Sequence, residues 1–93
     1  MLLLIRTRVA DYATWKSVFD ERESSRKEHG GKRHWIYRSA DEGNDVTISI
    51  EFATVDQAKA YAADPGLREA MARAGVSGQP DFAYLEEAET KTY

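Results

Sequence analysis

The sequence predicts one α+β domain of the ferredoxin-like class, with the element order βαββαβ. Three observations support this prediction: strand-like apolar patterns near both ends, two strand-like patterns in the middle, and two amphipathic helical segments between them. The simplest sheet for this order is antiparallel with spatial order 4-1-3-2, and both helices cover one face. At 93 residues the chain makes a single domain, which we place at residues 1–88.

The first strand is expected at residues 2–9, where an apolar run leads into alternating residues. The first helix is expected at residues 12–28. Asp11 precedes it and is a good N-cap, because its carboxylate can accept a hydrogen bond from the first turn. Gly30 and Gly31 end it, since glycine readily takes the left-handed conformation that terminates helices.

The second and third strands form a predicted hairpin. Residues 32–39 contain aromatic and β-branched side chains, and residues 40–45 have the composition of a turn. Residues 46–52 alternate without a break between apolar and polar side chains, so one face of this strand should meet the helices.

The second helix begins after Thr54 or Asp56, either of which can cap it. Pro65 interrupts the helical pattern and can restart it, because proline fits the first position of a helix. The apolar stripe then continues to Gly75.

The last strand is expected at residues 81–87, after a loop marked by Gly78 and Pro80. Residues 89–93 are polar and are expected to form a loose tail.

The helix-free face of the sheet should carry two leucines among charged residues. Strand alternation places Leu2 and Leu4 there beside Arg6, Arg8 and Glu51. A free monomer would leave these leucines in water, and another sheet commonly closes such a face. The sequence therefore predicts a homodimer formed through the helix-free sheet face.

The composition argues against several classes of function. The net charge of -3 gives no general attraction to nucleic acid or to anionic membranes, and no apolar segment is long enough to span a membrane. The chain has no cysteine, its two histidines lack ligand spacing, and its glycines form no phosphate-binding pattern. We therefore expect no metal, no cofactor, no nucleic-acid partner and no membrane partner, and take a cytoplasmic protein as the default.

An aromatic stripe runs along the first predicted helix. Tyr12, Trp15 and Phe19 fall on one helical face. The stripe fits two alternatives, which are stacking against a flat aromatic ligand and plain packing in the core. Two arginines further along this helix, Arg22 and Arg26, lie among glutamates, and we interpret them as part of a solvated face with local ion pairs.

The candidate general base is His34, the only histidine on a predicted strand. If Arg38 pairs with Val46 in the hairpin, His34 faces the helices, whereas a slip of one residue sends Trp35 and Tyr37 there. Arg38 would then share the face of His34 and could stabilise a developing oxyanion. The alternative is that His34 lies exposed on an edge strand and has no role.

Four stretches, which together span nearly the whole chain, are distinctive. They are Val9-Ala10-Asp11-Tyr12 with Trp15-Lys16 and Val18-Phe19-Asp20, Ile36-Tyr37-Arg38-Ser39-Ala40-Asp41 before Asn44, Asp64-Pro65 with Leu67-Arg68-Glu69-Ala70-Met71 and Ala74-Gly75-Val76, and Pro80 followed by Leu85-Glu86-Glu87. These stretches resemble the small dimeric α+β-barrel proteins related to the antibiotic-biosynthesis monooxygenases, some of them labelled cyclases.

The resemblance implies a homodimer whose two sheets form a shared barrel, with a pocket between sheet and helices in each subunit. We expect a small apolar or aromatic ligand there, in contact with Thr7, Tyr12, Trp15, Phe19, Tyr61 and Met71. The implied function is a cofactor-independent monooxygenase-like or cyclase-like enzyme acting on an aromatic or polyketide-like compound, with His34 and Arg38 as catalytic candidates. The alternative is a non-catalytic homodimer that binds a ligand or is purely structural.

Overall fold

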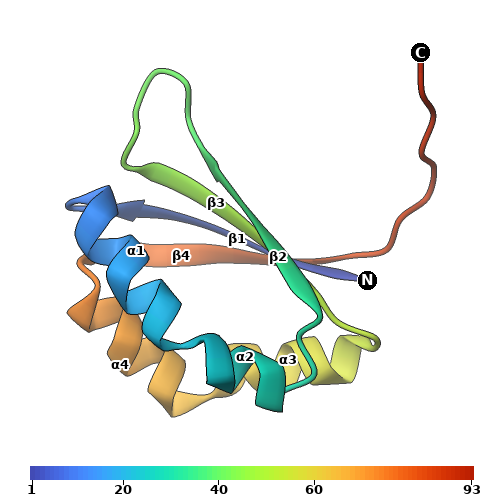
Figure 1. The fold of residues 1–93 in the computed structure, drawn as a ribbon, viewed down its shortest axis with the longest axis horizontal. Coiled ribbons are helices and arrows are strands. Elements are labelled where there is room, and N and C mark those ends of the chain that lie inside the picture. The colour runs from blue at the N-terminus through green and yellow to red at the C-terminus, as the bar shows by residue number, and fades with distance from the viewer.

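A four-stranded antiparallel sheet, covered on one face by helices, makes up the computed structural model, which describes residues 1–93 (Figure 1). The sheet order is β2-β3-β1-β4, which confirms the predicted ferredoxin-like topology. The elements in chain order are β1 (Leu2–Val9), α1 (Tyr12–Glu21), α2 (Glu23–Glu28), β2 (Arg33–Arg38), β3 (Asp45–Glu51), α3 (Val55–Ala63), α4 (Pro65–Arg73) and β4 (Val76–Leu85).

The core lies between the sheet and the helices. The inward positions of β1 are buried, as strand alternation predicts, and Leu3 is completely shielded from solvent. Arg38 pairs with Val46 across the hairpin, so the register that turns His34 toward the helices is the one adopted. Trp35 and Tyr37 consequently lie on the opposite, helix-free face.

The prediction of a single helix at residues 12–28 is wrong, because the chain forms two helices that meet at Arg22. Asp11 does cap α1, accepting a hydrogen bond from the Thr14 amide at 2.9 Å. At Arg22 the backbone leaves the helical conformation, with φ -93° and ψ 10°. No glycine or proline stands there, and the Arg22 side chain is instead held by Asp64, 42 residues later, at 3.2 Å.

The prediction of a loop at Gly78 and Pro80 is also wrong. Both residues belong to β4, which begins at Val76, five residues before the predicted start. The pairing of β1 with β4 shifts register between Arg6 and Arg8, so a bulge absorbs the irregular residues, and Gly78 takes a φ of +67°. Since β4 is an edge strand, Pro80 can lack an amide hydrogen there without costing the sheet an internal bond.

Local capping explains the two C-terminal helices. Thr54 and Gln57 form a capping box at the start of α3. Asp64 caps α4 by accepting a hydrogen bond from the Gly66 amide at 3.0 Å, and Pro65 occupies the first turn as predicted. Asp64 thus starts α4 and holds Arg22 at the junction of α1 and α2.

The helix-free face and the C-terminus complete the molecule. Leu2 and Leu4 are only partly covered on that face, and β4 ends at Leu85. The last residues have neither helix nor strand and extend away from the sheet (Figure 1). No helix is long and apolar enough to cross a bilayer.

Candidate functional site

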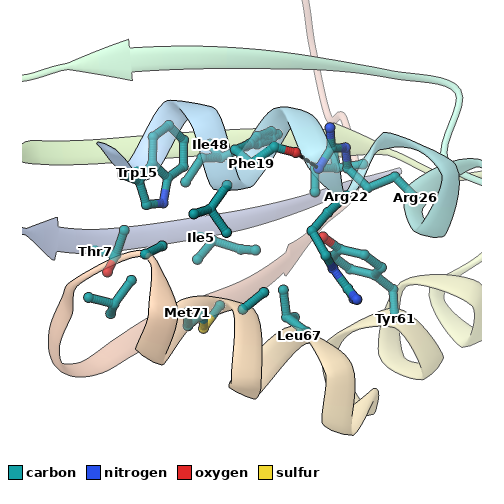
Figure 2. A pocket seen from close by; sticks show the side chains of 15 residues that line it. Ile5, Thr7, Trp15, Phe19, Arg22, Arg26, Ile48, Tyr61, Leu67 and Met71 are labelled. Carbon is teal, nitrogen blue, oxygen red and sulfur yellow. Dashed lines mark hydrogen bonds between the residues drawn. The ribbon is translucent and has the colours of Figure 1, made fainter. Parts of the chain in front are cut away.

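A small cavity of about 50 Å³ lies between the sheet and helices α1 and α4 (Figure 2). Most of its wall is apolar, which suits a small-molecule site with a few polar groups. Fifteen residues line it: Ile5, Thr7, Trp15, Val18, Phe19, Arg22, Arg26, Ile48, Ile50, Tyr61, Leu67, Ala70, Met71, Ala74 and Val76.

Two stacked aromatic rings form one wall. Trp15 and Phe19, one turn apart on α1, have ring centroids 5.1 Å apart and an interplanar angle of 9°. Both side chains are buried, so this pair also contributes packing energy to the core. Trp15 and Phe19 therefore both line the cavity and pack in the core.

Arg26 is the most deeply buried charged side chain at the cavity, with 5 % of its surface exposed. Its Nη1 donates a hydrogen bond to the carbonyl oxygen of Phe19 at 2.8 Å, and its guanidinium lies 3.7 Å from the Phe19 ring centroid. Burial lowers the pKa of Arg26, but an arginine in a protein stays protonated. The cavity therefore carries a fixed positive charge.

Arg22 places a second guanidinium at the same end. Its Nη2 donates to Asp64 Oδ2 and to Ser25 Oγ, both at 3.2 Å. Its Nε is buried and has no hydrogen-bond partner. A buried donor without an acceptor is costly, so this N–H is available to an acceptor atom of a ligand.

Tyr61 of α3 completes this polar end, which Figure 2 shows opposite Thr7. Burial raises the pKa of the Tyr61 phenol, and the positive charge of Arg26 opposes part of that rise. At neutral pH the hydroxyl is therefore protonated and can donate a hydrogen bond. Arg22, Arg26 and Tyr61 together form what we call the cationic end of the cavity.

The structure brings together five of the eight residues predicted for the site. Those lining the cavity are Thr7, Trp15, Phe19, Tyr61 and Met71, and those outside it are Tyr12, His34 and Arg38.

His34 does not line the cavity and is exposed on the edge strand β2. Its ring meets the Phe19 ring edge-on with centroids 4.8 Å apart, and it lines a polar surface groove with Lys27 and Lys32. Desolvation by its neighbours lowers the pKa of His34, and the charge of Arg26 adds to this effect.

Arg38 and Tyr12 form a separate contact near the hairpin turn. The Arg38 guanidinium lies 3.9 Å from the Tyr12 ring centroid, and its Nε donates to the Gly43 carbonyl at 2.8 Å. Arg38 is thus occupied by contacts outside the cavity.

The interpretation of Arg22 and Arg26 as members of a solvated helix face is wrong. The missed signal is their spacing, because residues 15, 19, 22 and 26 follow one another at intervals of four, three and four along one helical face. The two arginines therefore continue the aromatic stripe of Trp15 and Phe19. The neighbouring glutamates obscured this pattern. One of them, Glu23, forms a local ion pair with Lys27 at 3.6 Å.

The arrangement can stabilise a negative charge but has no group suited to accept a proton. Two guanidiniums and a phenol supply donors, whereas no histidine, carboxylate or lysine lines the cavity. A bound acid would have to ionise by releasing its proton to water, helped by the positive charge beside it.

The fold is that of the antibiotic-biosynthesis-monooxygenase-like proteins, as comparison with solved structures shows. No protein-family profile and no curated protein matches the chain. SnoaB, a cofactor-independent oxygenase from Streptomyces nogalater, superposes with a TM-score of 0.71 at 18% identity, covering 97% of this chain and 96% of its own.

Two further solved structures have the same fold. A candidate antibiotic biosynthesis monooxygenase from Bordetella bronchiseptica has a TM-score of 0.80 at 12% identity, with 95% of this chain and 96% of its own covered. One from Caulobacter crescentus has a TM-score of 0.73 at 21% identity, with 95% and 89% covered. At these identities the likeness establishes the fold alone.

Proposed function

We propose that this protein binds a small conjugated molecule as its phenolate or enolate in the cavity and oxygenates it without a cofactor. One observation carries the proposal: the buried, unpartnered Nε of Arg22 lies at the same end of an apolar cavity as the buried guanidinium of Arg26. Donors fixed in a low-dielectric site stabilise an oxyanion more strongly than water does. The aromatic wall of Trp15 and Phe19 suits the flat part of such a ligand.

The proposed reaction converts an activated CH2 group into a ketone. The CH2 group releases one proton to water as the enolate forms, and the enolate carbon donates electrons to dioxygen so that a C–O bond forms. Water returns a proton to the peroxide oxygen, and the hydroperoxide loses its remaining C–H proton as the O–O bond breaks and water leaves. Overall, one CH2 group and one O2 give one carbonyl group and one H2O. The chain's own residues hold the enolate oxygen at the cationic end and exclude bulk water from the apolar wall. SnoaB, named as a cofactor-independent oxygenase, supports this class of reaction.

Binding without catalysis is the second candidate. The lack of a proton acceptor at the cavity favours it, because an enzyme working on a weak carbon acid needs a base. His34 contacts Phe19 but does not line the cavity, so it could serve as the base only after a movement of side chains.

Titration of bound 4-nitrophenol tests the anion site, since its phenolate absorbs visible light and it ionises near neutral pH. We expect the protein to lower the pKa of the bound phenol, and expect Arg26→Met and Arg22→Met to reduce this shift. Arg73→Met is the matched control, because Arg73 is an exposed arginine paired with Glu21 at 2.8 Å. An unchanged phenol pKa in the presence of saturating protein would overturn the proposal.

Oxygen uptake separates oxygenation from binding. Phenylacetone is a suitable probe, because it has a single ring and its CH2 group is acidified by both the ring and the ketone. Uptake of one O2 per ketone formed, lost in Arg26→Met, supports the enzyme. Binding of 4-nitrophenol with no O2 uptake supports the ligand-binding protein.

We also propose that the protein is a homodimer formed through the helix-free face of the sheet. Tyr37 is 58% exposed and Leu85 is 42% exposed on a face that also carries the partly covered Leu2 and Leu4. Exposed apolar side chains gathered on one face of a sheet are typical of interaction surfaces. A second copy of the same face would cover them by sheet-on-sheet packing.

A further inference from the structure

Thr7 presents the second buried polar atom without a partner at the cavity. The residue is 5 % exposed, and its Oγ1 makes no hydrogen bond. Figure 2 shows it at the opposite end of the cavity from Arg22, Arg26 and Tyr61. The cavity therefore has an unused hydrogen-bonding atom at each of its two ends.

The position gives no structural reason for a hydroxyl. The other inward side chains of β1 are Leu3, Ile5 and Val9, and all are buried in the core. Thr7 pairs with Val46 on β3, and the register shift on the other side leaves it without a partner residue in β4. Valine has nearly the same shape and would bury no unpaired oxygen, so threonine makes the fold less stable than it could be.

The cavity volume limits the size of the ligand. A cavity of about 150 Å³ holds one benzene molecule, and this cavity measures about 50 Å³. Met71 lines it, is only partly buried, and has a flexible side chain that can move to admit one ring. Admitting several fused rings would require the helices themselves to separate.

We propose that the ligand is a single-ring compound with oxygen functions at both ends. Its oxyanion meets Arg22 and Arg26, and a carbonyl or hydroxyl group at the other end pairs with Thr7. This inference rests on the proposed function, because it takes the anion at the cationic end as given. Thr7 then selects ligands by their distal oxygen and takes no part in the chemistry.

Two phenols of similar size test the distal anchor: 4-hydroxyacetophenone, which carries a para ketone, and 4-ethylphenol, which does not. The ratio of their dissociation constants is measured by calorimetry for the wild type, Thr7→Val and Thr7→Ser. Comparing this ratio between variants cancels the different acidities of the two phenols. Loss of one hydrogen bond corresponds to a change of roughly tenfold, so we expect Thr7→Val to reduce the preference for the ketone by about that factor and Thr7→Ser to retain it.

Thermal unfolding without ligand gives an independent readout. Removing a buried unpaired hydroxyl should raise the Tm of Thr7→Val by roughly 4–8 °C for a domain of this size. A gain in stability together with a loss of ketone preference is the result expected of a ligand-binding position. A lower Tm would mean that the hydroxyl has a structural partner and would overturn the inference.

The outcomes separate the inference from the proposed function. If both phenols bind and depend on Arg26, but Thr7→Val leaves their ratio unchanged, the distal anchor is wrong and the anion site stands. If both phenols bind equally well to the wild type and to Arg26→Met, the anion site is wrong, and the two-ended ligand with it. Failure of both phenols to bind overturns both proposals.

Discussion

Arg26 lies against Phe19, the residue seven positions earlier, through two contacts at once: its guanidinium stacks 3.7 Å from the ring centroid and its Nη1 donates to the backbone carbonyl at 2.8 Å. These contacts join α1 to α2 across the break at Arg22. They also compensate part of the cost of burying the charge. One side chain thus stabilises the helix junction and supplies the positive charge of the cavity.

Arg26→Met should destabilise the protein by about 1–3 kcal/mol, because it keeps the apolar stem and loses both the charged hydrogen bond and the contact with the ring. Arg26→Lys should recover only part of this, since an ammonium lacks the planar face of a guanidinium. Urea denaturation measures the free energy of unfolding of both variants. Arg73→Met, at an exposed ion pair, should change stability by less than about 1 kcal/mol. Equal effects at the two positions would contradict the burial of Arg26.

His34 should titrate below the ordinary value of about 6.5, because desolvation and then the charge of Arg26 lower its pKa. Between the two pKa values the unfolded chain binds more protons, so the free energy of unfolding falls as the pH drops from about 6.5 through the lower folded value. NMR titration measures the pKa directly. His34→Gln should remove this part of the loss of stability in acid. His29→Gln, at the C-cap of α2, is the control variant for replacing a histidine elsewhere. A His34 pKa above its ordinary value would show that the ring has another environment.

Met71→Ala should enlarge the cavity and change which ligands it prefers. Removing the side chain should improve the binding of 2-naphthol relative to phenol, since two rings exceed the space now present. Fluorescence titration gives both affinities. Ala72→Gly, at an exposed position of the same helix, controls for loss of helix stability. An unchanged ratio would mean that Met71 does not limit the size of the ligand.

Leu4→Lys should dissociate the proposed dimer, because it places a charge in the middle of the helix-free face. Light scattering of the wild type at micromolar concentration should report twice the mass of the chain, and the variant should report one chain mass with the same circular dichroism. Ala60→Lys, on the exposed surface of α3, should remain dimeric. A folded wild-type monomer at this concentration would refute the dimer.

The alternation of residues and the capping signals were enough to predict the topology. The unbroken pattern from Val46 to Phe52 identifies β3, Asp11 marks the start of α1, and Pro65 marks the start of α4. These signals are local, because they depend on strand or helix periodicity and on hydrogen bonds within a few residues. The aromatic wall was predictable for the same reason, since Trp15 and Phe19 lie one helical turn apart.

Tertiary contacts decided where the helix breaks and what the cavity contains. Arg22 leaves the helix and binds Asp64, which is 42 residues away in sequence. Arg26 is buried because Phe19 offers it both a carbonyl and a ring face. Whether an arginine is solvated or buried depends on such partners, since its charge is costly to bury unless other groups compensate it. By itself, therefore, the sequence determined the sheet and the aromatic wall, whereas the positive charge and the size of the site were decided only when distant segments packed together.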